Sequence, residues 1–180
     1  MATTEPSEAL RQRLVAGRQW IDTTHGESNQ ELRSRFEHIT GKFLESVDGL
    51  PDEQLWFPEA EGKWSIYQVC LHTSNAVRLT AMLIRGLAAG HVPEMAKDIR
   101  LGVLDDDPGD FPRTRQQLVQ AFDTARGTAD LFDGDFHAGT TANHPYFGPL
   151  NARQWYVFNL MHMNYHIGQI NRIKSTPTFP

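Results

Sequence analysis

The sequence has little of several features that would define its class at once. A single cysteine, Cys70, excludes an intramolecular disulfide. Residues 1–10 have neither the basic region nor the apolar region of a secretory signal, so we expect a cytoplasmic protein. The longest apolar stretch is interrupted by Arg85 and is shorter than the roughly 20 residues needed to span a bilayer. No membrane role is therefore expected.

An excess of positive charge is also absent. The net charge is −5 and no dense block of Lys and Arg occurs, which argues against a nucleic-acid partner. Internal repeats and alternating strand patterns are lacking too. The acidic segment 105–110 lacks the ligand spacing of an EF-hand loop, so we interpret it as a solvated loop rather than a calcium site. A chain of 180 residues suits one domain that needs neither a disulfide nor a metal to fold.

What the sequence does have is helical periodicity behind clear start signals. Four residue pairs match a capping box, and each precedes apolar residues at helical spacing. The pairs are Ser28 with Glu31, Ser65 with Gln68, Thr114 with Gln117, and Asn151 with Gln154. We predict helices over about 28–48, 66–89 and 114–133, and a last helix that ends before Pro177. Four long amphipathic helices predict an all-α protein, a four-helix bundle.

Outside these four helices we expect only short helical segments and connections. A short amphipathic helix is expected from Pro6 to about Trp20, within an N-terminal helical extension over 1–27 that precedes a bundle domain over 28–180. Between Pro51 and Pro58 we expect one helical turn that buries Leu55, Trp56 and Phe57. Residues 90–112 read as a long connection, of a kind that can overhang a site as a lid.

Isolated histidines occur in the connection that precedes the last helix. His137 is expected at the surface. His144 is expected to have a structural role, as a cap within the loop. Neither lies within a helical pattern, so neither is predicted to bind a metal.

Two further histidines stand four residues apart in the last predicted helix. His162 and His166 share the face of Trp155 and Ile170, in the middle of the stripe that should be buried. Side chains at i and i+4 lie one turn apart, with Cβ atoms roughly 5–6 Å apart, so both imidazoles can hold one ion. His72 points into the core from the helix over 66–89. Three inward histidines on two helices favour a common role.

Three neutral imidazoles would form an all-nitrogen metal site. Such a site suits zinc, nickel, iron or copper and disfavours magnesium and calcium. We expect a divalent transition metal, with zinc or nickel preferred to iron or manganese. Three protein ligands leave a position for water or substrate, as catalytic sites do. An ion there would lower the pKa of a bound water or hold a substrate thiolate.

Two polar residues lie at the edges of the same inner face. We predict that Gln169 orients a ligand imidazole rather than binding the ion itself, and a polar bridge between helices is the alternative. Asn159 is expected to be satisfied together with the metal site, because an unpaired buried polar group costs about 1–3 kcal/mol. Cys70 lies on the opposite side of its helix from His72 and is expected to pack as a small apolar group.

Three segments together resemble the DinB/YfiT-like superfamily of metal-dependent enzymes. They are KWSIYQVCLH around His72, HPYFGPLNARQW, and HMNYHIGQI around His162 and His166. The resemblance covers roughly Ser28 to Ile173, and its most specific parts are the Trp-Ser lead to the first histidine and the closing H-x-x-x-H-x-x-Q. It implies an up-down-down-up bundle, a homodimer, and a divalent metal held by these three histidines.

Because fold and site do not fix a substrate, the resemblance leaves several functions open. It implies a thiol-dependent S-transferase or isomerase that uses a low-molecular-weight thiol such as bacillithiol or mycothiol. The alternatives are a metal-dependent hydrolase and a non-catalytic, stress-associated protein that binds a metal or small ligand. Neither metal-bearing helix carries Asp or Glu on its inner face, so the sequence identifies no catalytic base. A transferase needs less, because a metal ion can itself keep a thiol ionised.

Overall fold

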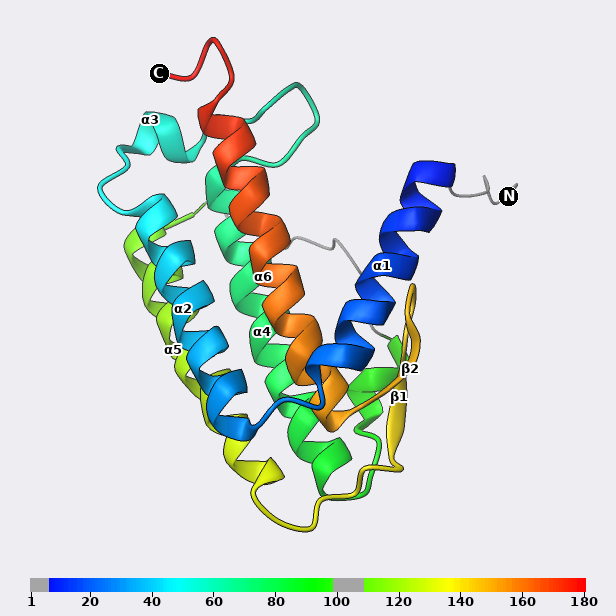
Figure 1. Cartoon of the computed structure of the whole chain (residues 1–180). Coiled ribbons are helices and arrows are strands. Elements are labelled where there is room, and N and C mark those ends of the chain that lie inside the picture. The colour runs from blue at the N-terminus through cyan, green and yellow to red at the C-terminus, as the bar shows by residue number, and fades with distance from the viewer. Residues whose placement is uncertain (1–6, 99–108) are drawn as a thin grey trace.

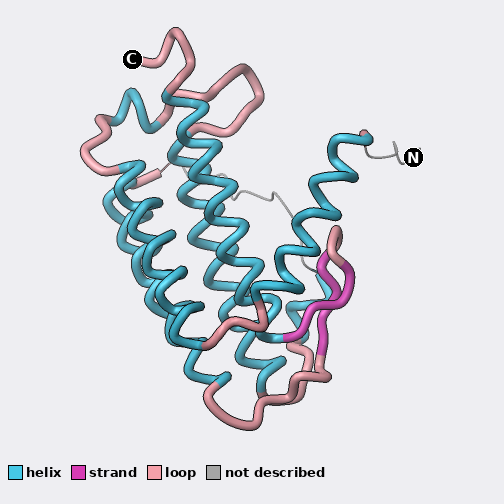
Figure 2. The backbone as a smooth tube through the Cα atoms, in the orientation of Figure 1, coloured by secondary structure: helices cyan, strands magenta, loops and turns pink. Residues whose placement is uncertain are grey.

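The computed structural model describes residues 7–98 and 109–180. Within these ranges the chain is mainly helical, with one short hairpin (Figure 2). The elements in order are α1 (Glu8–Thr24), α2 (Asn29–Val47), α3 (Asp52–Leu55), α4 (Ile66–Ala88), the 3-10 helix η1 (Glu94–Asp98), α5 (Phe111–Arg126), the 3-10 helix η2 (Gly127–Phe132), β1 (Thr141–His144), β2 (Gly148–Asn151) and α6 (Ala152–Lys174).

The four long helices α2, α4, α5 and α6 form the bundle. Figure 1 shows α2 and α6 running in one direction and α4 and α5 in the other, which is the expected up-down-down-up order. Within the connection expected over 90–112, η1 covers Glu94–Asp98 and α5 begins at Phe111. Residues 99–108, which include most of the acidic loop over 105–110, lie outside the described ranges, so the expected lid stays a prediction.

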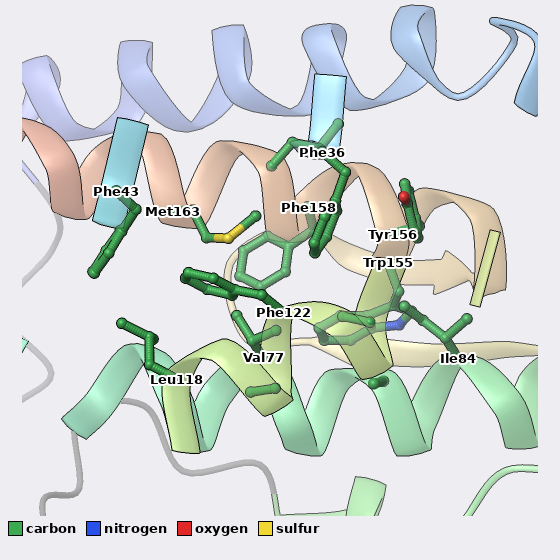
Figure 3. Packing of buried hydrophobic residues seen from close by; sticks show 14 of the residues in the cluster. Phe36, Phe43, Val77, Ile84, Leu118, Phe122, Trp155, Tyr156, Phe158 and Met163 are labelled. Carbon is green, nitrogen blue, oxygen red and sulfur yellow. The ribbon is translucent and has the colours of Figure 1, made fainter. Parts of the chain in front are cut away.

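The apolar stripes of the four helices meet in one continuous core. Burying one large apolar side chain contributes about 1.5–3 kcal/mol, so this cluster supplies the main driving force for folding. Figure 3 shows how side chains from all four helices pack together; those labelled are Phe36, Phe43, Val77, Ile84, Leu118, Phe122, Trp155, Tyr156, Phe158 and Met163. Cys70 is fully buried, and burial raises the pKa of its thiol to about 12, so it stays protonated and packs as an apolar group.

Three of the four predicted capping boxes are present. The side chains of Ser28, Ser65 and Asn151 each accept a bond from the backbone three residues on, and α2, α4 and α6 begin there as predicted. The fourth prediction is wrong. α5 begins at Phe111 with Asp110 as its cap.

Thr114 lies instead inside the first turn of α5. It is buried, and its hydroxyl donates to the Tyr67 hydroxyl over 3.2 Å. A threonine can bond to another helix as readily as it can cap its own, and the sequence pattern does not distinguish the two. The α-helix ends at Arg126, and η2 carries the chain on to Phe132, which is where the predicted helix was expected to end.

Two other expectations about the connections need correction. Residues 141–151 form an antiparallel hairpin, where no strands were predicted; each strand has four residues, too few for an alternating pattern to register. The turn at α3 buries Leu55, but Trp56 is 43% exposed and stacks on Tyr67. A single helical turn presents only one face to the core, so it does not bury three consecutive residues.

The N-terminal helix α1 packs against the hairpin and α6. Arg18 donates to the carbonyl oxygens of Phe147 and Pro149 over 2.6 and 3.2 Å. Gly17 lies so close that a Cβ there would stand 3.2 Å from both Met161 and Phe147. Toward its N-terminus, α1 diverges from α6 (Figure 1). In 7–98 and 109–180, no helix is long and apolar enough to cross a membrane.

Candidate metal centre

The two central helices of the site bring the predicted ligands together. α4 carries His72 in its second turn, and α6 carries His162 and His166 one turn apart on the side that faces α4. Capping boxes fix where both helices begin, and the buried apolar stripe of each helix sets the face that turns toward the other. Residues 90 positions apart in the chain thereby come into contact.

The three imidazoles meet through their Nε2 atoms. His162 Nε2 lies 3.2 Å from His72 Nε2 and 3.0 Å from His166 Nε2. Three nitrogens at tetrahedral angles around an ion with bonds of about 2.0–2.1 Å would stand about 3.3 Å apart. The two nitrogen–nitrogen distances are thus close to those expected around one shared metal ion. A small movement of the imidazole rings would make up the difference.

Gln169 sets the tautomer of one of these rings. Its Oε1 lies 2.9 Å from His166 Nδ1. An amide oxygen only accepts, so His166 Nδ1 carries the proton and the lone pair of its Nε2 points to the centre. This is the contact predicted for Gln169, and it leaves the imidazole in the form that binds a metal.

Burial keeps all three imidazoles neutral. Desolvation lowers the pKa of His72 and lowers that of His162 well below its usual value, where His166 and His72 add to the effect. Burial also lowers the pKa of His166 to about 4, against a smaller opposing effect of Gln169. Histidine binds a metal only in its neutral form, so the lowered pKa values leave all three rings able to act as ligands at neutral pH.

Aromatic side chains enclose the histidines. Trp64 packs on His72 with ring centroids 4.7 Å apart, and Phe158 stacks on His162 at 5.5 Å. Tyr165 meets His166 edge-on at 5.2 Å. These contacts hold each ring in one orientation and keep water from most of its surface.

The histidines open into a pocket of about 610 Å³. This is within the usual range of small-molecule sites, and most of the lining is apolar. Helix α6 and the segment before α4 form one side, the hairpin forms a second, and α1 forms a third. The lining residues are Leu10, Arg13, Leu14, Gly62, Lys63, Trp64, His72, His144, Tyr146, Phe147, Phe158, Met161, His162, Tyr165, His166 and Gln169.

Sequence reasoning missed part of this lining. His144 caps the hairpin turn as expected, since its Nδ1 accepts from the backbone N–H groups of Tyr146 and Phe147 over 3.1 and 3.3 Å. It also lines the pocket, and its buried Nε2 has no partner among the described residues. The hairpin that places it there left no periodic signal. The contribution of Leu10 and Arg13 was missed because helical periodicity does not tell where an added helix packs.

Asn159 does not line the pocket. It is fully buried on α6, and neither its Oδ1 nor its Nδ2 has a partner in the part of the chain that the structure describes. It stands three residues before His162, on the same side of α6. The expectation that its amide is satisfied together with the metal site stays a prediction.

Fold and site together define a class: a four-helix bundle with three neutral imidazoles that converge at a pocket and fit a divalent metal ion. The chain belongs to the DinB superfamily, whose family model matches residues 35–170. That match includes all three histidines, Gln169 and the hairpin. It does not include α1.

Solved structures share this fold. YfiT from Bacillus subtilis, described as a probable metal-dependent hydrolase with an unusual four-helix bundle topology, is 18% identical with a TM-score of 0.62, over 82% of this chain and 86% of that one. TT2238, described as a four-helix bundle protein, is 20% identical with a TM-score of 0.56, over 80% and 98%. At these identities the likeness concerns the fold alone. No curated protein matches the chain significantly.

Proposed function

We propose that this chain is a metal-dependent enzyme that transfers a low-molecular-weight thiol to a small electrophilic substrate. His72, His162 and His166 would hold the divalent ion, zinc or nickel in preference to iron or manganese. Bound there, the ion would act as a Lewis acid that favours the ionised form of a thiol at neutral pH. Gln169 orients the His166 ring, and the aromatic side chains exclude water from it.

One observation carries the choice of a transferase over a hydrolase. Among the described residues that line the pocket, none is Asp or Glu. Hydrolysis by this type of site commonly uses a carboxylate to accept a proton from water. Thiol transfer needs no such group once the thiol is ionised, so the chemistry of the lining favours it.

Hydrolysis is the second candidate. It is favoured by the fold shared with YfiT, itself described as a probable metal-dependent hydrolase. A third reading is a protein that binds a metal or small ligand without catalysis. Cytoplasmic location and a homodimer remain predictions from the sequence.

Cobalt-substituted protein separates these functions. Titration with mycothiol or bacillithiol should add a sulfur-to-metal charge-transfer band to its absorption spectrum. The Cys70→Ser variant should show the same band, because Cys70 is fully buried and does not line the pocket. A cobalt spectrum that responds to hydroxide or a carboxylate but to neither thiol would contradict thiol transfer and favour hydrolysis or simple binding.

A further inference from the structure

The pocket has charges of one sign only. Of its described lining residues, Arg13 on α1 and Lys63 before α4 are the charged ones, and no carboxylate lies among them. Neither side chain forms an ion pair within residues 7–98 and 109–180. The lining is therefore positively charged, although the net charge of the whole chain is −5. Such a concentration of one sign favours a ligand of the opposite sign.

Arg13 is placed at the pocket by the way α1 packs. Arg18 bonds two hairpin carbonyl groups, and Gly17 lets the helix approach Met161 closely. Leu10 and Leu14 stand four residues apart on one face of α1 and also line the pocket, and Arg13 follows Leu10 by three residues. The contacts at Gly17 and Arg18 therefore place the N-terminal part of α1, with Leu10, Arg13 and Leu14, along one side of the pocket.

Lys63 stands on another side of the same pocket. It directly precedes Trp64, whose ring packs on His72 with centroids 4.7 Å apart. An ammonium group here lies on the segment that covers the histidines. Between the two cations the walls are mainly apolar and aromatic, as the side chains of Phe147, Phe158 and Met161 show.

We infer that the pocket selects a small molecule with an apolar or aromatic body and a carboxylate, and that the positive charge of Arg13 and Lys63 attracts this carboxylate. The inference rests on the proposed function only in taking the pocket of the three histidines as the substrate site. A guanidinium forms two parallel charge-assisted hydrogen bonds with a carboxylate, which gives orientation as well as affinity. Arg13 lies on α1, outside the region matched by the DinB model, whereas Lys63 lies inside it.

Calorimetry with a matched pair of probes tests the inference. The probes are 3-phenylpropionate and its neutral analogue 3-phenylpropanamide, titrated into metal-free and zinc-loaded protein. We expect the metal-free protein to bind the carboxylate at least about fivefold more tightly than the amide, a modest ratio because both cations are exposed to solvent. In the Arg13→Gln/Lys63→Gln variant this ratio should fall toward one while the affinity for the amide is retained, which also shows that the variant is folded.

Arg11→Gln is the control on the same helix. It removes the same charge from α1, but Arg11 pairs with Glu8 over 3.3 Å and is not among the lining residues. The ratio should therefore be unchanged in this variant. An equal loss in Arg11→Gln, equal binding of both probes by the unmodified protein, or no binding of the carboxylate would each overturn the inference.

The two forms of the protein separate this inference from the proposed function. A preference for the carboxylate that appears only with zinc means that the ion binds the carboxylate, which overturns the role of Arg13 and Lys63 and leaves thiol transfer standing. A preference that survives metal removal and depends on these two cations supports the inference, even where cobalt-substituted protein shows no band with a thiol.

Discussion

At the scale of single residues, the site depends on which nitrogen of each imidazole is free. His166 is the best-defined case, because Gln169 Oε1 holds the proton on its Nδ1 and leaves Nε2 turned toward His72 and His162. Without that acceptor the ring could adopt the other tautomer, or rotate about its χ2 bond. The amide thus acts on the metal through the histidine.

Gln169→Ala should weaken metal binding by about 10–100-fold, because the orienting hydrogen bond is lost while all three imidazoles remain. Competition with a chelating dye measures the affinity. His72→Ala is the reference, and it should abolish stoichiometric binding since one of three ligands is removed. Affinity in Gln169→Ala that equals the unmodified protein's would reduce Gln169 to a polar bridge, and a complete loss would make it a ligand.

The same scale shows what the sequence could and could not predict about the site. The spacing of His162 and His166 and the inward direction of His72 follow from 3.6-residue periodicity, which is a local property. The pocket role of His144 depends on a hairpin turn in which its Nδ1 accepts two backbone bonds. That turn is a tertiary feature with no periodic signal in its four-residue strands.

At the scale of elements, the helices that begin with a true capping box were predicted within a residue or two. α5 was misplaced because Thr114 bonds Tyr67 across the bundle, while Asp110 caps the helix one turn earlier. For α1 the sequence predicted a helix and left its packing open. The structure ties it to the hairpin through Arg18 and to α6 through Asp22, to whose Oδ1 Gln154 Nε2 donates over 2.8 Å.

Arg153 joins three elements and offers a test at this scale. From the first turn of α6 its guanidinium donates to the carbonyl oxygens of His25 and Glu27 and to Asn29 Oδ1, which together form the connection from α1 to α2. Its guanidinium carbon also lies 5.4 Å from the centre of the Phe132 ring. One side chain therefore ties the segment between α1 and α2 to α6.

Arg153→Ala should lower the free energy of unfolding by about 2–4 kcal/mol, because several acceptors lose a charged donor at once. Urea unfolding followed by circular dichroism measures the change. Arg126→Ala is the matched control: Arg126 is exposed and its nearest ion pair, with Glu37, spans 3.3 Å, so its loss should cost no more than about 1 kcal/mol. Equal effects of the two substitutions would show that the connection is not held by Arg153.

At the scale of the whole molecule, the bundle is stable only while several buried histidines stay neutral. Burial lowers the pKa of His144 to about 4 and that of His166 to about 4, and it lowers the pKa of His72 and His162 as well. An unfolded chain has histidines with a pKa of about 6.5. Protonation of His144 would also remove the acceptor for two backbone N–H groups of the hairpin.

The metal-free protein should therefore lose stability as the pH falls from about 6.5 to about 4. In this window the unfolded chain binds more protons than the folded one, so the free energy of unfolding decreases with each step of acidification, and above about 6.5 it is independent of these groups. For His144, buried with 3% of its surface exposed, the full loss is about 3 kcal/mol. Most carboxylates titrate below pH 5, so the upper part of the window reports the histidines.

Urea unfolding at closely spaced pH values between 7.5 and 4.5 measures this loss. His144→Asn is the control variant, since its Oδ1 replaces Nδ1 as the acceptor for Tyr146 and Phe147 without a group that titrates. Its unfolding free energy should depend less steeply on pH than that of the unmodified protein. Zinc should steepen the dependence instead, because each ligand must be deprotonated for the ion to stabilise the fold and its affinity falls below pH 6.5. A free energy of unfolding that stays constant from pH 6.5 to 5 would mean that the three imidazoles and His144 are not buried as neutral groups.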